Sequence, residues 1–387
     1  MVLLTALLLA SIPQDAVEVP FHMGDNAIIV EATVNNKKLS LMFDSGFSGT
    51  VVVDQNIELG PPSGEITLRD FVGEFHAHTV KIKTLKLGSM SIDTSEMEAV
   101  EQPVGRDSFS YNAHVDGILG LQAIMNNVTE INFQNQKFIL HPKSFDITKR
   151  VPDNKTTFLV KMLPLGVNSV ELPVYTPEGK RMILALDTGN AFYATTHKDV
   201  LERVGLWDSN RTPKFAKGSM VASGAVDSWE KQLKDMKVFD VPVPTSYWDV
   251  IDLPASSAEG DGTIGIRFLK NFNVTIDYER RRVWLENFTG QTGNQPKGEV
   301  GLLAASDRSL GYVKVYRVTP GSPGAKAGIQ AEDEILSING QELRPSITYR
   351  QVEALLNGEP GTKIDIAISR AGQLMRFQLE RVAMFNE

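Results

Sequence analysis

Short runs of β-branched and aromatic residues dominate the first three quarters of the chain and alternate with polar residues. Examples are AIIVEATV at 27–34, HTVKIKTLKLG at 78–88 and RRRVWLENF at 280–288. Clusters of Gly, Pro, Asn and Asp separate these runs, as expected for strands joined by turns. Helical spacing is confined to short stretches such as HKDVLERVG at 197–205. The pattern predicts a mainly β region from about residue 18 to 286.

Two pairs of segments in this region resemble each other. DGILGLQAIMNNVTEINFQNQKFILHP (116–142) aligns without a gap with DGTIGIRFLKNFNVTIDYERRRVWLEN (261–287), and LSLMFDSGFSGTVVV (39–53) has the same form as RMILALDTGNAFYAT (181–195). The identical pairs in the longer repeat are Asp116/Asp261, Gly117/Gly262, Gly120/Gly265, Asn126/Asn271, Ile131/Ile276 and Leu140/Leu285. The repeat predicts two β lobes of one design in tandem, joined near residues 143–157.

Each shorter repeat is an apolar strand that ends in Asp-Ser/Thr-Gly, at Asp44 and at Asp187. Two carboxylates held together at a two-fold interface cannot both ionise cheaply, so they share a proton. The protonated member can polarise a carbonyl while the ionised member activates a water, which is amide hydrolysis without a covalent intermediate.

The residues that follow each aspartate suit such a pair. The hydroxyls of Ser45 and Thr188 can lock each loop to the other lobe. Gly46 and Gly189 let the backbone approach the carboxylates closely.

On these motifs, roughly residues 25–287 resemble the single-chain, two-lobed aspartic peptidases of the pepsin and retropepsin kind. In that family each lobe contributes one Asp-Thr/Ser-Gly loop and a later apolar-apolar-Gly turn that packs across it. The resemblance implies that Asp44 and Asp187 are the catalytic dyad. The matching later turns are Ile118-Leu119-Gly120 and Thr263-Ile264-Gly265.

The chain departs from this family at three places. Phe47 and Asn190 follow the two glycines where a small or hydroxyl residue is common, so the pH optimum cannot be carried over. The candidate substrate-covering flap is TLRDFVGEFHAHT at 67–79, with Gly73, and it lacks the tyrosine of pepsin-like flaps. These departures keep a second interpretation open, a peptide-binding or scaffolding protein that retains the fold without turnover.

A serine nucleophile is a third interpretation. Ser48 lies in Gly-Phe-Ser-Gly, but Thr50 breaks the Gly-x-Ser-x-Gly pattern of a nucleophile elbow. The corresponding residue in the second repeat is Ala191. A serine nucleophile also needs an adjacent general base and an oxyanion hole, which no motif here supplies.

The hydrophobic pattern changes after the polar segment TGQTGNQPKGE at 289–299. GYVKVYRVTPGSPGAKAGIQAEDEILSINGQEL (311–343) predicts strand, turn, short helix and strand, followed by a helix in TYRQVEALLNG and a final hairpin. About residues 301–382 resemble a PDZ domain, and Gly324 and Glu332 depart from its motif.

The PDZ resemblance implies a site for peptide C termini. A peptide could add as a strand beside LGYVKV, with its carboxylate received by the loop Ser309, Leu310, Gly311 and Tyr312. Tyr349 and Val352 of the following helix would line the groove. A domain that only packs against the preceding lobes is the alternative.

Composition excludes several other classes of protein function. A formal net charge of −8 offers no basic stripe for nucleic acid, and the absence of cysteine excludes disulfides and thiol catalysis. His76 and His78 would share one face of a strand, but without a third ligand we expect a hydrogen-bonded pair rather than a metal site. We therefore expect no metal and no cofactor.

The N terminus, MVLLTALLLASIPQDA, has an apolar run too short to span a membrane. It is typical of an export signal cleaved near Ala16, although the first lysine is Lys37. We expect an exported, periplasmic or secreted protein without an integral membrane span.

The expected fold class is mainly β, with tandem pseudo-two-fold lobes of the acid-protease type followed by a PDZ domain. The expected divisions are 1–16 for a signal peptide, 17–150 for the first lobe, 151–288 for the second, 289–300 for a linker and 301–383 for the PDZ domain. The expected activity is that of an aspartic endopeptidase acting on protein or peptide substrates.

Overall fold

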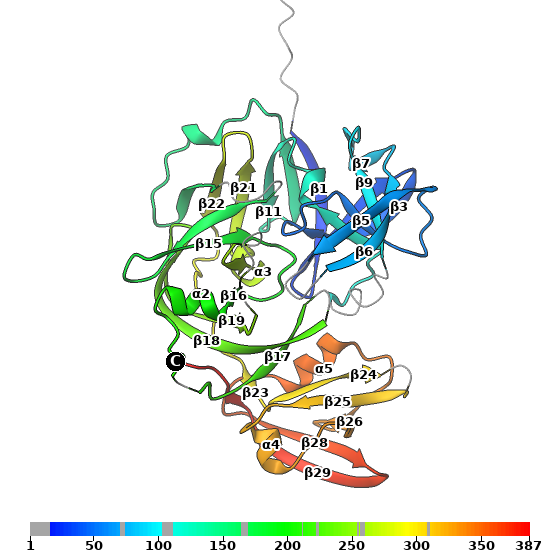
Figure 1. Ribbon diagram of the computed structural model, residues 1–387, viewed down its shortest axis with the longest axis vertical. Coiled ribbons are helices and arrows are strands. Elements are labelled where there is room, and N and C mark those ends of the chain that lie inside the picture. The colour runs from blue at the N-terminus through cyan, green and yellow to red at the C-terminus, as the bar shows by residue number, and fades with distance from the viewer. Residues whose placement is uncertain are drawn as a thin grey trace, which may run out of the picture.

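The fold was established from a computed structural model, which shows two β lobes side by side above a smaller C-terminal module (Figure 1). The structure describes residues 16–69, 74–102, 111–163, 169–210, 212–221, 224–253, 255, 260–307 and 310–387. Most described segments are strands, as the alternating pattern predicts.

A central sheet joins the two lobes. Its order is β13 (Thr157–Lys161), β22 (Arg282–Asn287), β21 (Phe272–Asp277), β11 (Val128–Asn132), β12 (Lys137–His141) and β1 (Val17–Gly24). At its centre β11 and β21, which belong to the two copies of the longer repeat, pair antiparallel, with Ile131 opposite Val274. Because antiparallel pairing of equivalent strands creates a local two-fold axis, the repeat becomes a pseudo-symmetric sheet.

The first lobe continues from β1. Its strands run in the order β2 (Ala27–Val34), β3 (Lys37–Asp44), β10 (Gly117–Gly120), β4 (Val51–Asp54), β9 (Glu98–Gln102), β6 (Glu74–Lys81) and β5 (Pro62–Arg69), with β7 (Leu85–Leu87) and β8 (Met90–Ile92) beside β2. The 3-10 turn Leu121–Ala123 follows β10, and a second such turn, Ile147–Lys149, follows β12.

The second lobe repeats this arrangement. Its order is β14 (Glu171–Tyr175), β15 (Arg181–Leu186), β20 (Gly262–Ile264), β16 (Ala194–His197), β19 (Val241–Ile251), β18 (Gly224–Val238) and β17 (Lys217–Val221). Helix α2 (Lys198–Arg203) follows β16, and α3 (Ile266–Leu269) follows β20. The series β10, β4, β9, β6, β5 thus corresponds to β20, β16, β19, β18, β17, which confirms the tandem lobes.

One hydrophobic core fills both lobes. Phe43, Phe138, Trp248 and Phe268 are almost fully buried within it, and β21 has no exposed residue. Burial of such large side chains is the main stabilising contribution to a fold of this kind. The core extends directly to the strands that carry Asp44 and Asp187.

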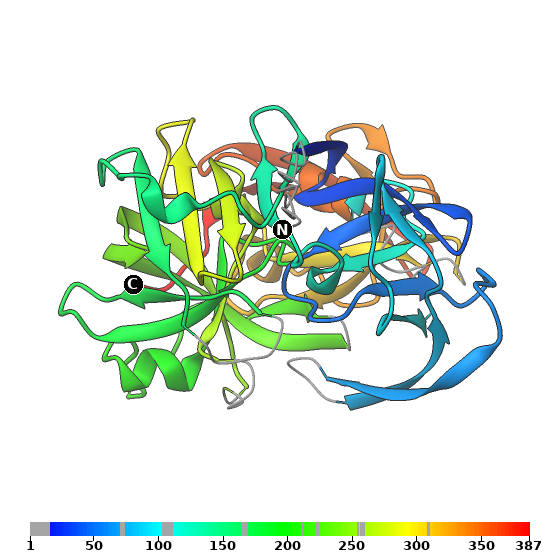
Figure 2. The ribbon, with the colours of Figure 1, turned by 90° about the horizontal axis from the view of Figure 1, so that it is seen from above.

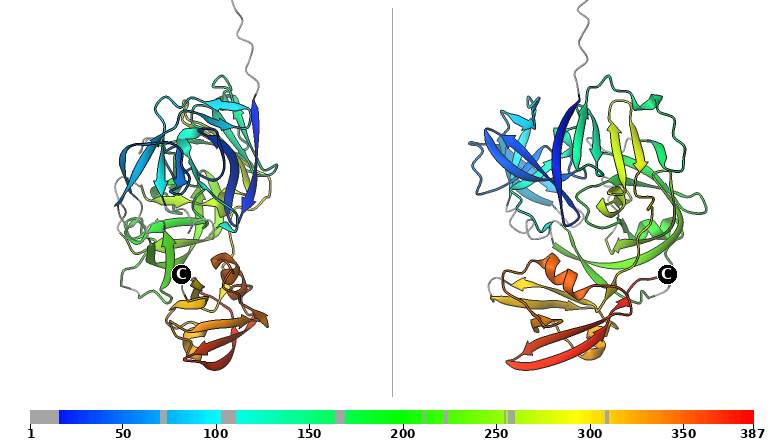
Figure 3. Two further views of the ribbon diagram at one scale, coloured as in Figure 1. Left: turned by 90° about the vertical axis from the view of Figure 1, so that its right-hand side faces the viewer. Right: turned by 180° about the vertical axis from the view of Figure 1, so that it is seen from behind.

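The C-terminal module has a core of its own and lies as a separate layer beneath the lobes (Figure 3). Its sheet order is β24 (Leu302–Asp307), β25 (Tyr312–Val318), β26 (Glu334–Ile338), β28 (Lys363–Arg370) and β29 (Gln373–Glu380), with β27 (Gln341–Glu342) beside β26. Helices α4 (Pro323–Ala327) and α5 (Tyr349–Leu356) complete it, and Thr348 and Gln351 form a capping box at the start of α5. The predicted Asn339-Gly340 turn is present, with positive φ at both residues.

The segment expected to be a linker packs against the second lobe. The Tyr193 hydroxyl donates to the Thr292 carbonyl, and the Asn294 side chain exchanges hydrogen bonds with the backbone of Tyr247 at 2.8 and 3.0 Å. The short strands β23 (Gly298–Glu299) and β30 (Val382–Ala383) then pair with each other. The start of the module is therefore tied to the second lobe, and its two ends are tied to each other.

Candidate active site

The two aspartates lie where apolar strands end near the lobe interface. Asp44 is the last residue of β3, and β10 runs parallel to that strand with Gly120 opposite Asp44. Asp187 follows β15, and its amide donates to the carbonyl of Ile264 in the equivalent strand β20 at 3.0 Å. Each loop is thus held by the apolar-apolar-Gly segment that the repeat predicts.

A second pair of aspartates holds the strands that lead to these loops. Asp116 accepts a hydrogen bond from the Ser40 amide at 2.8 Å, and Asp261 accepts one from the Ile183 amide at 2.9 Å. The two carboxylates, identical in the repeat, therefore have the same structural role in their respective lobes.

Four hydrogen bonds cross between the loops. The Ser45 amide donates to Thr188 Oγ1 at 2.9 Å, and the Thr188 amide donates to Ser45 Oγ at 3.0 Å. The two hydroxyls donate in turn to the carbonyls of Leu186 and Phe43, at 2.8 and 2.9 Å. Because both side chains are buried, this reciprocal network fixes the relative position of the two aspartates.

Each loop glycine lies against the carboxyl group of the other lobe. A Cβ atom at Gly189 would lie 2.4 Å from Asp44 Cγ, and one at Gly46 would lie 2.7 Å from Asp187 Cγ. Real Cβ atoms do not approach so closely, so only glycine fits at either position. The two carboxyl groups are therefore adjacent and sit between the two loops.

Backbone amides hold one oxygen of each carboxyl group. Asp44 Oδ1 accepts from Gly46 and Phe47 at 2.7 and 3.1 Å, and Asp187 Oδ1 accepts from Gly189 and Asn190 at 2.9 and 3.0 Å. This near-identical geometry orients both carboxyl groups in the same way.

The two carboxyl groups differ in pKa. Burial raises the pKa of Asp44, although amide hydrogen bonds and one from Asp187 partly lower it. Burial and the negative charge of Asp44 raise the pKa of Asp187 well above its ordinary value. The pair is therefore arranged to share one proton, so that it presents an acid and a base together.

The departures at Phe47 and Asn190 have structural explanations. The Phe47 ring covers the glycines of its own lobe, where Cβ atoms at Gly49 and Gly120 would meet it at 2.4 and 2.5 Å. The Asn190 side chain turns away from Asp187 and donates to Thr195 and Thr263 at 3.0 and 2.7 Å. Both side chains brace their loops, so neither replaces a hydroxyl beside the carboxyl groups.

The remaining candidates lie apart from this network. Ser48 is exposed and follows the Asp-Ser-Gly loop, whereas Ser45 within that loop is buried at the lobe interface. His76 contacts Thr67 and His78 contacts Glu65 across the hairpin β5–β6, as cross-strand pairs. No group of three or more potential metal-ligating side chains occurs among the described residues.

The candidate flap coincides with the hairpin β5–β6, which spans 62–81. Its central residues, 70–73, include Gly73 and lie outside the described part of the chain. Sequence analysis did not single out the hairpin β17–β18, which occupies the equivalent position in the second lobe. The same strand order after each Asp loop is the signal that could have identified it.

In the C-terminal module, β25 is paired on both sides. β24 lies on one side and β26 on the other, so the prediction that a peptide adds beside LGYVKV is wrong. Leu310 and Gly311 already donate their amides to the carbonyl of Asp307 at 3.2 and 2.8 Å, in the turn that ends at Tyr312. Ser309 lies outside the described residues.

One edge of this sheet is β24, and the other is β29. Within the described chain β24 pairs only with β25, and α5 packs beside it. Tyr349 is half-buried on α5, while Val352 is fully buried in the core of the module and cannot line a groove. Edge strand β24, with α5 beside it, therefore has an unpaired side within the described chain.

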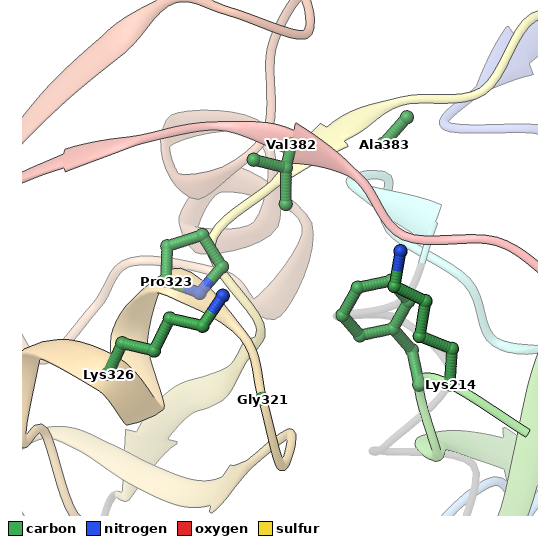
Figure 4. Close-up of a pocket in the computed structure, with 7 residues that line it drawn as sticks. Lys214, Gly321, Pro323, Lys326, Val382 and Ala383 are labelled. Carbon is green, nitrogen blue, oxygen red and sulfur yellow. The ribbon is translucent and has the colours of Figure 1, made fainter.

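One cavity lies at the junction of the second lobe and the module, well separated in sequence from the Asp loops (Figure 4). It has a volume of about 410 Å³ and is lined by Lys214, Phe215, Gly321, Pro323, Lys326, Val382 and Ala383. Among the described residues, no helix is both long and apolar enough to cross a membrane.

Comparison with known proteins shows sequence similarity over part of the chain. The carboxy-terminal processing protease CtpA of Bacillus subtilis is 32% identical over 72 residues, which cover 19% of this chain and 15% of that protein. The periplasmic pH-dependent serine endoprotease DegQ of Escherichia coli is 29% identical over 129 residues, covering 32% of this chain and 27% of that protein. The chain thus matches less than a third of the length of either relative.

A solved aspartic proteinase from Irpex lacteus superposes with a TM-score of 0.44 at 13% identity, covering 72% of this chain and 98% of that one. A family model described as PDZ domain matches residues 314–370. The chain is therefore a mainly β protein whose C-terminal module carries a PDZ domain.

Proposed function

We propose that the protein is an aspartic endopeptidase of the two-lobed, pepsin and retropepsin-like kind. The observation that carries the proposal is the adjacent pair of Asp44 and Asp187, with opposed loop glycines and reciprocal hydroxyl bonds across the interface. A water held between the carboxyl groups would be activated by Asp44 while Asp187 protonates the carbonyl oxygen of the peptide. Ser45, Gly46, Thr188 and Gly189 support this dyad.

The relatives favour the broader class. Both are named proteases, and one is named a serine endoprotease, so they support peptide hydrolysis without supporting the aspartic type. The E. coli relative is named periplasmic, which supports our proposal of export. We keep the proposed divisions at residues 17–150, 151–288 and 301–383, with 289–300 as a packed connection.

The test is cleavage of a diverse peptide mixture by residues 17–387 from acid to neutral pH, beside a Ser48→Ala variant. We expect cleavage by both proteins, with new product ends that define the specificity. Loss of cleavage in Ser48→Ala alone would support a serine mechanism. No cleavage by the folded wild type at any pH would favour a peptide-binding protein that keeps the fold.

The pH dependence of cleavage should follow the dyad. Activity falls as the pH decreases through the pKa of Asp44, where both carboxyl groups are protonated, and as it rises through the pKa of Asp187, where both are ionised. Since burial raises the pKa of both carboxyl groups, and the charge of Asp44 raises that of Asp187 further, kcat/KM should be bell-shaped. A profile that rises steadily to alkaline pH would contradict this, provided circular dichroism shows the fold intact throughout.

The PDZ domain would bind the C-terminal segment of a substrate or a regulatory peptide by strand addition to β24. In the Asp187→Asn full chain, a pool of peptides with free C termini should protect backbone amides in Leu302–Asp307 and in α5 from hydrogen exchange. The same peptides with amidated ends test whether the carboxylate is needed. Protection at the opposite edge, β29, or at neither edge would contradict binding at β24.

A further inference from the structure

Hairpin β17–β18 is the counterpart of the candidate flap β5–β6. In each lobe a strand after the Asp loop pairs parallel with a later strand, β4 with β9 and β16 with β19. That later strand then pairs antiparallel with one arm of the hairpin, β6 or β18. Both hairpins lie on the same side of the molecule (Figure 2). Hairpin β17–β18 is therefore the second-lobe equivalent of the candidate flap.

A buried lysine connects β17–β18 to the strand that enters the PDZ domain. Lys217 Nζ, on β17, donates to Glu230 Oε2 on β18 at 3.2 Å and to Glu299 Oε1 on β23 at 2.6 Å. The exposed fractions of these side chains are 15%, 23% and 19%. Burial raises the pKa of Glu299, while the charge of Lys217 lowers it. Without the lysine, two neighbouring carboxylates would lie in a poorly hydrated place.

Two further contacts join the same hairpin to the C-terminal part of the chain. Arg317 on β25 forms an ion pair with Asp227 on β18. The tail residue Asn386 donates its amide to the Glu230 carbonyl at 2.7 Å and accepts from the Gln232 amide at 2.8 Å. The hairpin lies between α5 and the lobes in opposite views (Figures 1 and 3).

The first-lobe hairpin has no such connection. In the described part of the chain, β5–β6 makes no hydrogen bond or ion pair to residues 298–387, and its polar contacts are local, such as Ser63 with Thr79 and Glu98. Among the described residues, the C-terminal part of the chain, through Glu299, Arg317 and Asn386, therefore contacts hairpin β17–β18 and not hairpin β5–β6.

We propose that Lys217 is a positioning residue for peptide substrate: it sets the position of hairpin β17–β18 beside the carboxyl pair by fixing it to Glu299 at the entrance of the PDZ domain. The proposal rests on the proposed peptidase function. It makes the PDZ domain part of the substrate-binding side of the enzyme, because a displacement of β23 would reach the hairpin through one buried ion pair. Since Lys217 does not contact the dyad loops, it should affect substrate binding more than the chemical step.

The test compares Lys217→Met, Lys217→Arg and the control Lys234→Met, which removes an exposed lysine from the same hairpin. Lys217→Met should raise KM about fivefold or more with kcat within about twofold of the wild type. Lys217→Arg retains the charge and both donors, so it should restore KM to within about twofold. Lys234→Met should match the wild type.

Hydrogen exchange of the intact chain gives a readout that does not need turnover. In Lys217→Met, amides of residues 228–238 should exchange faster than in the wild type, while those of β5–β6 should not change. If the wild type fails to cleave peptides, the proposed function fails and exchange still decides whether Lys217 holds the hairpin. Unchanged exchange in β18, or an unchanged KM in a cleaving enzyme, would overturn the proposal.

Discussion

Asp187→Asn is expected to lower kcat for peptide cleavage at least about 1,000-fold while the protein stays folded, and Asp44→Asn should do the same. The amide has nearly the shape of the carboxyl group, so the cross-lobe bonds of Ser45 and Thr188 are kept. It can neither share the proton nor supply the base, so the water cannot be activated. Steady-state kinetics on a peptide identified from the mixture would measure the loss.

Asp187→Asn should also change how the free energy of unfolding depends on pH. The pKa of Asp187 is higher in the folded state than in the unfolded state. At a pH between these two pKa values, the folded protein therefore binds more protons than the unfolded protein. The stability contributed by the protonated dyad is therefore fully present below the unfolded pKa and is lost as the pH rises through the folded pKa. Urea unfolding should show wild-type stability falling over this range, with a smaller fall in Asp187→Asn.

Retained turnover in both variants would exclude the dyad. Loss of turnover together with loss of the cooperative unfolding transition would mean that the substitution had damaged the fold, so unfolding curves are required for each variant. Asp116→Asn is a poor control because Asp116 holds the strand that leads to Asp44. Asp93→Asn, on an exposed turn, is a better one.

Gly189→Ala is expected to abolish cleavage through sterics alone. Its Cβ would lie 2.4 Å from Asp44 Cγ and 2.5 Å from both carboxyl oxygens, so the carboxyl groups or the lobes must separate. Displacement by even 1 Å from the productive geometry costs on the order of 100-fold in rate. Overpacking of this kind also lowers the free energy of unfolding by about 1–3 kcal/mol.

Gly46→Ala should behave alike, because its Cβ would lie 2.7 Å from the Asp187 carboxyl group. Gly64→Ala, outside the candidate flap segment 67–79, is the matched control, because its Cβ would lie 3.4 Å from Thr79 Oγ1, an ordinary separation. Wild-type kcat/KM in Gly189→Ala would mean that the carboxyl groups are not held together in the working enzyme. Measurement of kcat/KM and of urea unfolding for all three variants separates loss of chemistry from loss of stability.

Several features of the site were predictable because the sequence repeats. Two equivalent loops on equivalent strands meet if the lobes are related by a two-fold axis, and the Asp-Ser/Thr-Gly order supplies the hydroxyl and the glycine that this meeting requires. The alternation of apolar and polar residues predicted the strands, and the Asn339-Gly340 turn predicted its hairpin. These predictions depend on local periodicity or on comparison of one segment with its copy.

The free edge of the PDZ domain was not predictable in the same way. LGYVKV has a strand pattern, but only the pairing of β25 with both β24 and β26 shows that its edges are occupied. The packing of Phe47 over Gly49 and Gly120 likewise depends on the return of a strand from far along the chain. An alternating pattern reports which face of a strand is buried, but it does not report the strand's neighbours.

The sequence by itself determined the mainly β class, the tandem lobes, the two Asp loops and the C-terminal PDZ domain, because strand periodicity and repeats are written locally. Only the tertiary structure decided that Lys217 joins Glu230 and Glu299, and that Arg317 of the PDZ domain pairs with Asp227 of hairpin β17–β18. The sequence does not indicate which charged residues, far apart along the chain, will form ion pairs. They become an ion pair only when folding brings them together and removes the water between them.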